Sequence, residues 1–162
     1  MNASIRTGRL RTLRCQAGED QRRESRSKPR RTSVPGVPEL QAGIEASHEF
    51  DVSGPLLTDV GGTLGFSVLS SPGMIAMIER TAAMLVYPLL GDGRATVGFE
   101  VCVKHVAAAS EGSRCTAHAR LEEIIDGRKL RFAVEVTAHD GRTIGIGTHE
   151  RRVIAANVLS RS

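Results

Sequence analysis

The sequence predicts an α+β fold in which an antiparallel sheet curves around one long buried helix. Residues 71–85 are apolar on nearly every side, and helices with this pattern are buried. Residues 95–154 alternate between apolar and polar side chains and are interrupted by two Asp-Gly turns, which is typical of strands joined by hairpins. A helix that is apolar all round needs a sheet wrapped around it, which is the hotdog architecture.

The composition fits one domain with an aliphatic core. The chain has 162 residues, of which 40% are hydrophobic and only 3% aromatic, and this length suffices for a sizeable core. No apolar run is long enough to cross a membrane, and the charged N-terminus lacks the apolar stretch of a secretory signal. Three cysteines without metal-ligand spacing indicate reduced thiols, so we expect a cytoplasmic protein.

The positive charge belongs to a tail. Residues 1–35 hold ten Lys and Arg against three acids, a net charge of +7, whereas residues 36–162 carry −3. We therefore divide the chain into a disordered basic tail (1–42), one domain (43–156) and a C-terminal tail (157–162). The basic tail fits nucleic acid or an anionic surface, but it lacks interleaved aromatics for base stacking, so we do not expect a nucleic-acid partner.

The first half of the domain leads into the helix. Residues 44–52 are predicted to form a strand, residues 55–65 a loop rich in Gly, and residues 66–69 a short extended piece. Ser71 is placed to cap the helix, and Pro72 suits its first turn. The helix is expected to end near Tyr87-Pro88.

The second half is predicted to be a meander of four strands, residues 95–105, 114–125, 130–138 and 142–154. In the first of them one inward face is expected to hold Val97, Phe99, Val101, Val103 and His105. Asp126-Gly127 and Asp140-Gly141 mark the hairpin turns. Such a sheet leaves open edges and a partly covered helix, so we expect a homodimer at least.

Glu79 and His105 are the first candidates for chemistry. A carboxylate within an apolar helix is paired, protonated or catalytic, unless it simply faces solvent. His105 ends the inward face of its strand and is either a hydrogen-bonded core residue or catalytic. If the sheet wraps the helix, the two can form an acid–base pair.

Three further residues are candidates for the site, and each of them also has a purely structural explanation. Ser71 offers a hydroxyl near a helix N-terminus, where a carbonyl can be polarised, although N-capping alone would explain it. Gly98 interrupts a strand of large residues, which often marks close approach of a ligand or another chain. Arg151 can bind a phosphate or orient the site, or can pair with Glu150 on the surface.

The stretch from about Ser71 to Ile154 resembles the fluoroacetyl-CoA thioesterase family of hotdog proteins. The matching pieces are Met77-Ile78-Glu79, Val97-Gly98, Val101 to Ala109, Ala138 to Gly141, and Gly147 to Arg151. The resemblance implies a catalytic set of Ser71, Glu79 and His105, with Ser71 at the family's Thr position. It also implies that Gly98 and Arg151 bind substrate, and that no metal or cofactor is needed beyond the coenzyme A of the substrate.

The expected activity is hydrolysis of a short-chain acyl-CoA. The alternatives are a non-catalytic acyl-CoA binding or regulatory module and an acyl-CoA hydratase or dehydratase. The family's Phe-rich lid is shortened here to a Gly-rich segment with Phe66 as its only aromatic, so strong selectivity for fluoroacetyl-CoA is not expected.

If Ser71 begins a straight helix, Glu79 lies roughly 12 Å further along it. Either the helix begins later, or the site draws groups from two subunits.

Overall fold

The computed structural model of the protein describes residues 40–157. Most of the predicted basic tail and the C-terminal tail, together with Cys15, lie outside these residues. The elements are β1 (Glu45–Asp51), a 3-10 helix η1 (Gly54–Leu56), β2 (Leu57–Thr58), β3 (Val68–Leu69), α1 (Ser71–Val86), a 3-10 helix η2 (Tyr87–Leu89), β4 (Arg94–His105), β5 (Arg114–Ile125), β6 (Lys129–Ala138) and β7 (Thr143–Ala155). Within this part of the chain, no helix has both the length and the hydropathy to cross a membrane.

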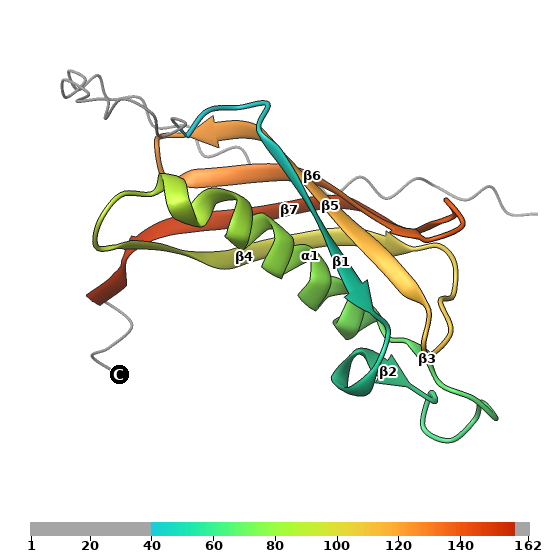
Figure 1. The fold of residues 1–162 in the computed structure, drawn as a ribbon. Helices are drawn as coiled ribbons and strands as arrows, with labels where there is room; N and C mark the ends of the chain where they lie inside the picture. Colours follow the sequence, from blue (N-terminus) through green and yellow to red (C-terminus); the bar gives the residue numbers. More distant parts are fainter. Residues whose placement is uncertain (1–39, 158–162) are drawn as a thin grey trace, which may run out of the picture. The chain divides into compact units, whose positions relative to one another are not determined.

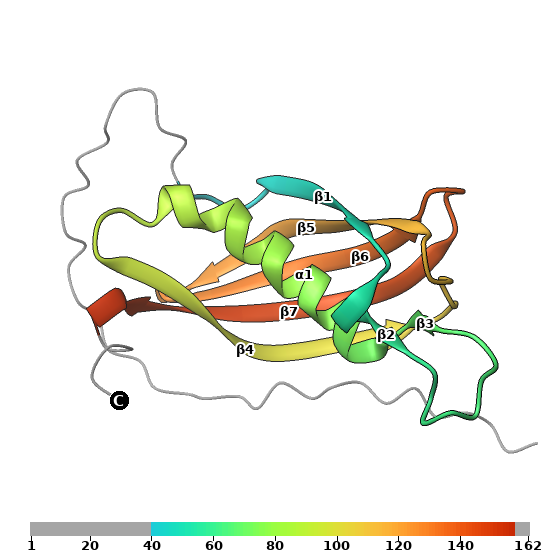
Figure 2. The same cartoon turned by 60° about the horizontal axis from the view of Figure 1, so that its bottom comes forward.

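The main sheet has the strand order β1-β5-β6-β7-β4, with antiparallel neighbours, and it curves around α1 (Figures 1 and 2). This confirms the predicted fold class. The predicted four-strand meander is wrong, because β4 pairs with β7 and not with β5. The connection between β4 and β5 runs along the end of the sheet, where its backbone bonds to Ile144, Leu69 and Val52. Sequence order alone does not reveal this crossing.

The core lies between α1 and the concave face of the sheet. Alternate residues of β5 and β6 face α1 and are all buried: Cys115, Ala117, Ala119 and Leu121 of β5, and Leu130, Phe132, Val134, Val136 and Ala138 of β6. Those of β5 are mostly small, which leaves room for the helix against the sheet.

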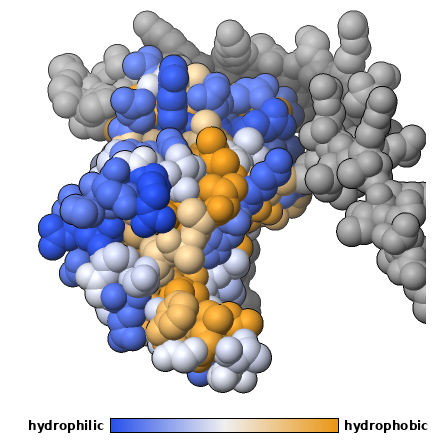
Figure 3. Space-filling view, turned by 90° about the vertical axis from the view of Figure 1, so that its right-hand side faces the viewer, coloured by the Kyte–Doolittle hydropathy of each residue, from blue (hydrophilic) through white to orange (hydrophobic). Residues whose placement is uncertain are grey.

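One side of α1 remains open, along a stripe formed by Ala76, Arg80, Met84 and Tyr87. Viewed from the right-hand side of Figure 1, hydrophobic side chains form a band between hydrophilic ones (Figure 3). Apolar surface is thus left for a partner.

A β-bulge changes the predicted face of β4. Gly98 pairs with Arg151 and Glu100 pairs with Glu150, so Phe99 is an extra residue without a partner on β7. An extra residue shifts the alternation of the preceding positions by one. The prediction that Phe99 faces inward is therefore wrong. Its ring is 54% exposed and lies against the guanidinium of Arg152, while Gly98 turns toward α1.

Candidate functional site

The first part of the site lies at the N-terminus of α1. Ser70, not Ser71, is the N-cap, since its Oγ accepts a hydrogen bond of 2.9 Å from the Gly73 N–H. Ser71 is the first helical residue, and its Oγ lies 3.1 Å from Nδ1 of His105. The interpretation of Ser71 as a plain cap is thus wrong. Capping by its neighbour leaves the Ser71 hydroxyl for the imidazole.

His105 reaches this position from the end of β4, where it stands opposite Gly145. Its Nε2 is buried and has no hydrogen-bond partner among the described residues. An unpaired ring nitrogen in the interior costs free energy, so such a group is explained when a ligand or another chain completes it. The Nε2 position of His105 is therefore open to a group that residues 40–157 of one chain do not supply.

The second part of the site is centred on Glu79. Its side chain is 41% exposed and lies against Gly98, where a Cβ would collide with Glu79 Oε1. Because α1 is regular from Ser71 onward, Glu79 lies about 12 Å from Ser71 along the axis. The predicted pairing of Glu79 with His105 is thus not formed within residues 40–157 of one chain. The possibility that the helix begins after Ser71 is also excluded.

His149 and Arg151 project from β7 toward Glu79. Nδ1 of His149 lies 2.8 Å from the Glu100 carbonyl oxygen, which can only accept, so Nδ1 carries the proton. Nε2 then accepts from Nη1 of Arg151 at 3.2 Å and lies 4.0 Å from Glu79 Oε1. Burial lowers the pKa of His149 below 6.5, and the charge of Arg151 acts in the same direction.

Arg151 is held by α1 and β4 rather than by Glu150. Its guanidinium donates to the Thr96 hydroxyl and the Thr96 carbonyl, each at 3.0 Å, and to the Glu79 carbonyl at 3.3 Å. The alternative of a surface arginine paired with Glu150 is wrong, because Arg151 is buried. This geometry favours an orienting role over phosphate binding.

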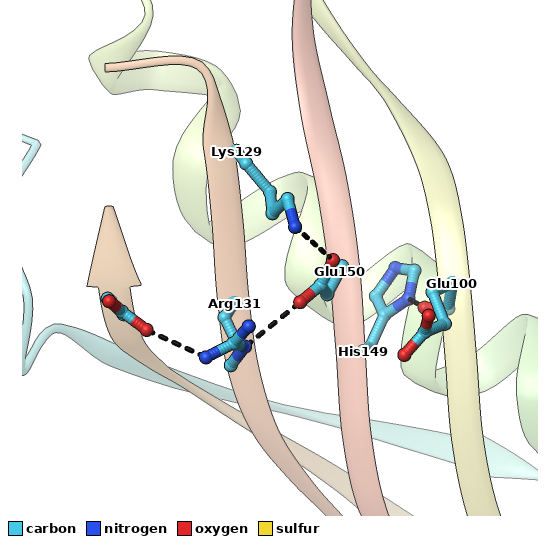
Figure 4. Close-up of polar contacts among 6 residues, drawn as sticks. Glu100, Lys129, Arg131, His149 and Glu150 are labelled. Atoms are coloured by element: carbon cyan, nitrogen blue, oxygen red, sulfur yellow. Dashed lines mark hydrogen bonds and ion pairs between the residues drawn. The ribbon is translucent and has the colours of Figure 1, made fainter. Parts of the chain in front are cut away.

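Glu150 lies on the opposite face of β7 and belongs to a separate polar network. It accepts from Arg131 at 2.9 Å and pairs with Lys129 at 3.2 Å, as Figure 4 shows. Arg131 also pairs with Glu123 at 2.8 Å. This network lies on the outer face of β7, whereas His149 and Arg151 lie on its inner face.

Sequence reasoning missed His149. The available signal was the alternation of β7: His149 and Arg151 are two residues apart, so they share a face. Once Arg151 is a site candidate, His149 is one as well. The pattern does not show that both lie beside Glu79, since that requires the pairing of β7 with β4.

The hollows of the surface do not by themselves locate this site. A groove of about 400 Å³ lies on β1, β5, β6 and β7 and contains none of the predicted site residues. A smaller pocket of about 280 Å³ lies between α1 and β4 and includes Thr96, which anchors Arg151. The site is therefore defined by the contacts of its side chains and not by a cavity. Among residues 40–157, no group of three or more His, Cys, Asp or Glu side chains is arranged to hold a metal ion.

Comparisons with known proteins match most of the described residues to one family. A family model described as fluoroacetyl-CoA-specific thioesterase matches residues 56–157. A fluoroacetyl-CoA thioesterase of Streptantibioticus cattleyicolor is 38% identical over 88 residues, which are 54% of this chain and 61% of that relative. The matched stretch thus spans less than two thirds of the relative's length.

Two solved structures extend the likeness to the fold. A structure of the fluoroacetyl-CoA thioesterase FlK has a TM-score of 0.68 and 26% identity, covering 76% of this chain and 94% of that one. A thioesterase superfamily member from Thermus thermophilus has a TM-score of 0.66 and 25% identity, covering 78% and 90%.

Proposed function

Because the chain belongs to the family of fluoroacetyl-CoA-specific thioesterases, we propose that it hydrolyses a short-chain acyl-CoA with Ser71, Glu79 and His105. The products are a carboxylic acid and free coenzyme A. Two of the groups that such a reaction needs, a carboxylate and an imidazole, lie on the face of the sheet that carries α1.

The setting of Glu79 carries this proposal. Its carboxylate is 41% exposed and lies against Gly98 of β4, where the absence of a side chain leaves room for it. The carboxylate is thus accessible from solvent while it also lies 4.0 Å from Nε2 of the buried His149. A side chain at position 98 would displace this carboxylate, so Gly98 keeps Glu79 in its place.

The chemistry divides between the two parts of the site. Glu79 removes a proton from a water that attacks the thioester carbonyl, or attacks the carbonyl itself to form a mixed anhydride, which water then hydrolyses to the acid and free Glu79. His105 donates a proton to the sulfur as the bond to coenzyme A breaks. Ser71, at the positive end of α1 and 3.1 Å from His105, positions the acyl oxygen or the water. Arg151 orients Glu79 through its backbone carbonyl.

We propose that the two parts of the site meet across a homodimer. The unpaired nitrogen of His105 and the distance along α1 both favour a site completed by Glu79 of the partner subunit. The outer edge of β4 and the open stripe of α1 provide the surface for that contact. A sheet continued through β4 would also cover an edge that is otherwise prone to aggregation.

A thiol-release assay with a panel of acyl-CoAs tests this function. We expect the native protein to release coenzyme A from acetyl-, propionyl- and fluoroacetyl-CoA, and Glu79→Gln to do so about a hundredfold more slowly. Binding without release would favour the acyl-CoA binding module, and addition of water to an enoyl-CoA would favour the hydratase.

Selectivity for fluoroacetyl-CoA is expected to be weak. Phe66 is 64% exposed, so it does not close over a ligand within this chain. We expect kcat/KM for fluoroacetyl-CoA and acetyl-CoA to differ by roughly tenfold or less, the scale of one small contact difference. A ratio of several orders of magnitude in this assay would contradict the prediction.

A further inference from the structure

His149 is buried in the site, yet the proposed chemistry gives it no task. Its side chain is 0% exposed, and its ring stacks on Phe132 with the centroids 6.2 Å apart and the planes inclined by 26°. Both ring nitrogens have partners of fixed polarity, a carbonyl that accepts and a guanidinium that donates. The ring is thereby locked as the neutral imidazole with its proton on Nδ1.

Each of these two bonds holds a neighbour of Glu79. The Glu100 carbonyl follows the bulge of β4 directly, so the Nδ1–H bond fixes the bulge whose Gly98 lies against Glu79. The Nε2 bond fixes Arg151, which in turn donates to the Glu79 carbonyl. His149 thus connects β7, β4 and α1 at one point.

We propose that His149 is a positioning residue of this site, which as a neutral imidazole holds Arg151 and the β4 bulge in the arrangement that places Glu79. The kinetic part of this inference rests on the proposed thioesterase function. The structural part concerns the tautomer of His149 and the placement of the Glu79 carboxylate. It does not depend on the thioesterase function.

The charges around the ring determine what protonation would do. Glu79 of α1 faces Nε2 at 4.0 Å, Arg151 of the same strand faces it at 3.2 Å, and the Glu100 carbonyl faces Nδ1. Glu150 acts on the ring from the neighbouring position. A proton on Nε2 would point at the N–H of Arg151 and break that bond, and it would draw the Glu79 carboxylate into an ion pair. Protonation of His149 would therefore reorganise the contacts of both Arg151 and Glu79.

Two substitutions separate the two bonds. His149→Asn retains a donor near the Nδ1 position but lacks the acceptor for Arg151, whereas His149→Gln retains an acceptor near Nε2 and loses the donor to Glu100. His118→Asn is the control, since His118 is likewise a strand histidine with two hydrogen-bond partners, Ser47 and Thr137, but is half-buried and lies outside the site.

We expect His149→Asn to reduce kcat roughly 10- to 100-fold, the scale of a misplaced catalytic group, with little change in KM. His118→Asn should leave both kcat and KM unchanged. Native kcat in His149→Asn, or a loss carried by KM alone, would overturn the proposal.

Nuclear magnetic resonance of the full chain tests the structural part without activity. The ¹⁵N shifts should assign the proton of His149 to Nδ1 at neutral pH. The side-chain carboxyl ¹³C signal of Glu79 should move in His149→Asn and not in His118→Asn. A proton on Nε2, or an unmoved Glu79 signal, would overturn the proposal. If the native protein releases no coenzyme A, the proposed function fails, and these two signals still decide the role of His149.

Discussion

Glu79 is the side chain on which the proposed chemistry depends most directly. Glu79→Gln keeps the shape and removes the charge, so the fold should persist while kcat falls by about two orders of magnitude, the usual scale for a lost general base. His105→Ala should cost a similar factor. If the two act as a unit, the double variant should be little worse than either single one. Steady-state kinetics of the three variants measure this, and unchanged turnover in Glu79→Gln would end the proposal of an enzyme.

Gly98 offers a test of how closely Glu79 is placed. In Gly98→Ala the new methyl group would collide with Oε1 of Glu79, the far end of a flexible side chain. Glu79 can turn away, so the melting temperature should change little, whereas kcat should fall roughly tenfold or more because the carboxylate is displaced.

The matched control is Gly65→Ala. A Cβ at Gly65 meets nothing within 4 Å, and its backbone needs no positive φ. This variant should keep both its melting temperature and its kcat. Equal kcat in the two alanine variants would show that the space at Gly98 is not used by the reaction.

At the scale of the elements, β7 carries site residues on one face and an ion-pair network on the other. His149 and Arg151 face α1, while Glu150 faces outward and binds Lys129 and Arg131 on β6. Burial raises the pKa of Glu150, but the bonds from Arg131 and Lys129 outweigh it and hold that pKa below 4.5. The charged form of Glu150 is therefore stabilised in the folded state.

Glu150→Gln should lower the free energy of unfolding by about 1–3 kcal/mol at pH 7, since hydrogen bonds to charged groups are of this size. The folded-state pKa is lowered, so this contribution is present above pH 4.5 and lost as the pH falls through the folded-state value. Urea unfolding of both proteins from pH 7 to pH 3 should show their stabilities converging. Asp140→Asn, which breaks the exposed pair with Arg142, should leave the stability unchanged. A stability difference for Glu150→Gln that is independent of pH would contradict this account.

At the scale of the whole molecule, the open side of α1 predicts the assembly. Met84 and Tyr87 are 46% and 72% exposed and line the pocket between α1 and β4. Apolar side chains at an open sheet edge favour a second copy of the chain. We expect light scattering at micromolar concentration to give at least twice the 17.4 kDa of one chain.

Met84→Glu should weaken this dimer by placing a charge in the contact. If the site draws on both subunits, activity per chain should then rise with protein concentration. Ile146→Glu is the control, because Ile146 is similarly exposed but lines the groove on the other face of the sheet. A monomeric native protein with full activity would exclude the shared site.

Local patterns determined most of what is regular in this protein. The helix of residues 71–85 and the strands of residues 95–154 follow from periodicity and turn residues, because burial of one face imposes a period of 3.6 or 2 on the sequence. Glu79 and Gly98 were found in the same way, as residues that interrupt those patterns, whereas Arg151 was a candidate because of its charge and the family resemblance. Gly98 and Arg151 do lie beside Glu79.

Only the tertiary structure decided which of these residues meet. The pairing of β4 with β7, and not with β5, brings His149 and Arg151 to Glu79. The bulge that turns Phe99 outward, and the capping of α1 by Ser70 in place of Ser71, each depend on a shift of one residue. A period of two or 3.6 is unchanged by the choice of partner strand, and neighbouring serines are equally good caps. Contacts between segments far apart in the chain therefore had to be seen in the fold.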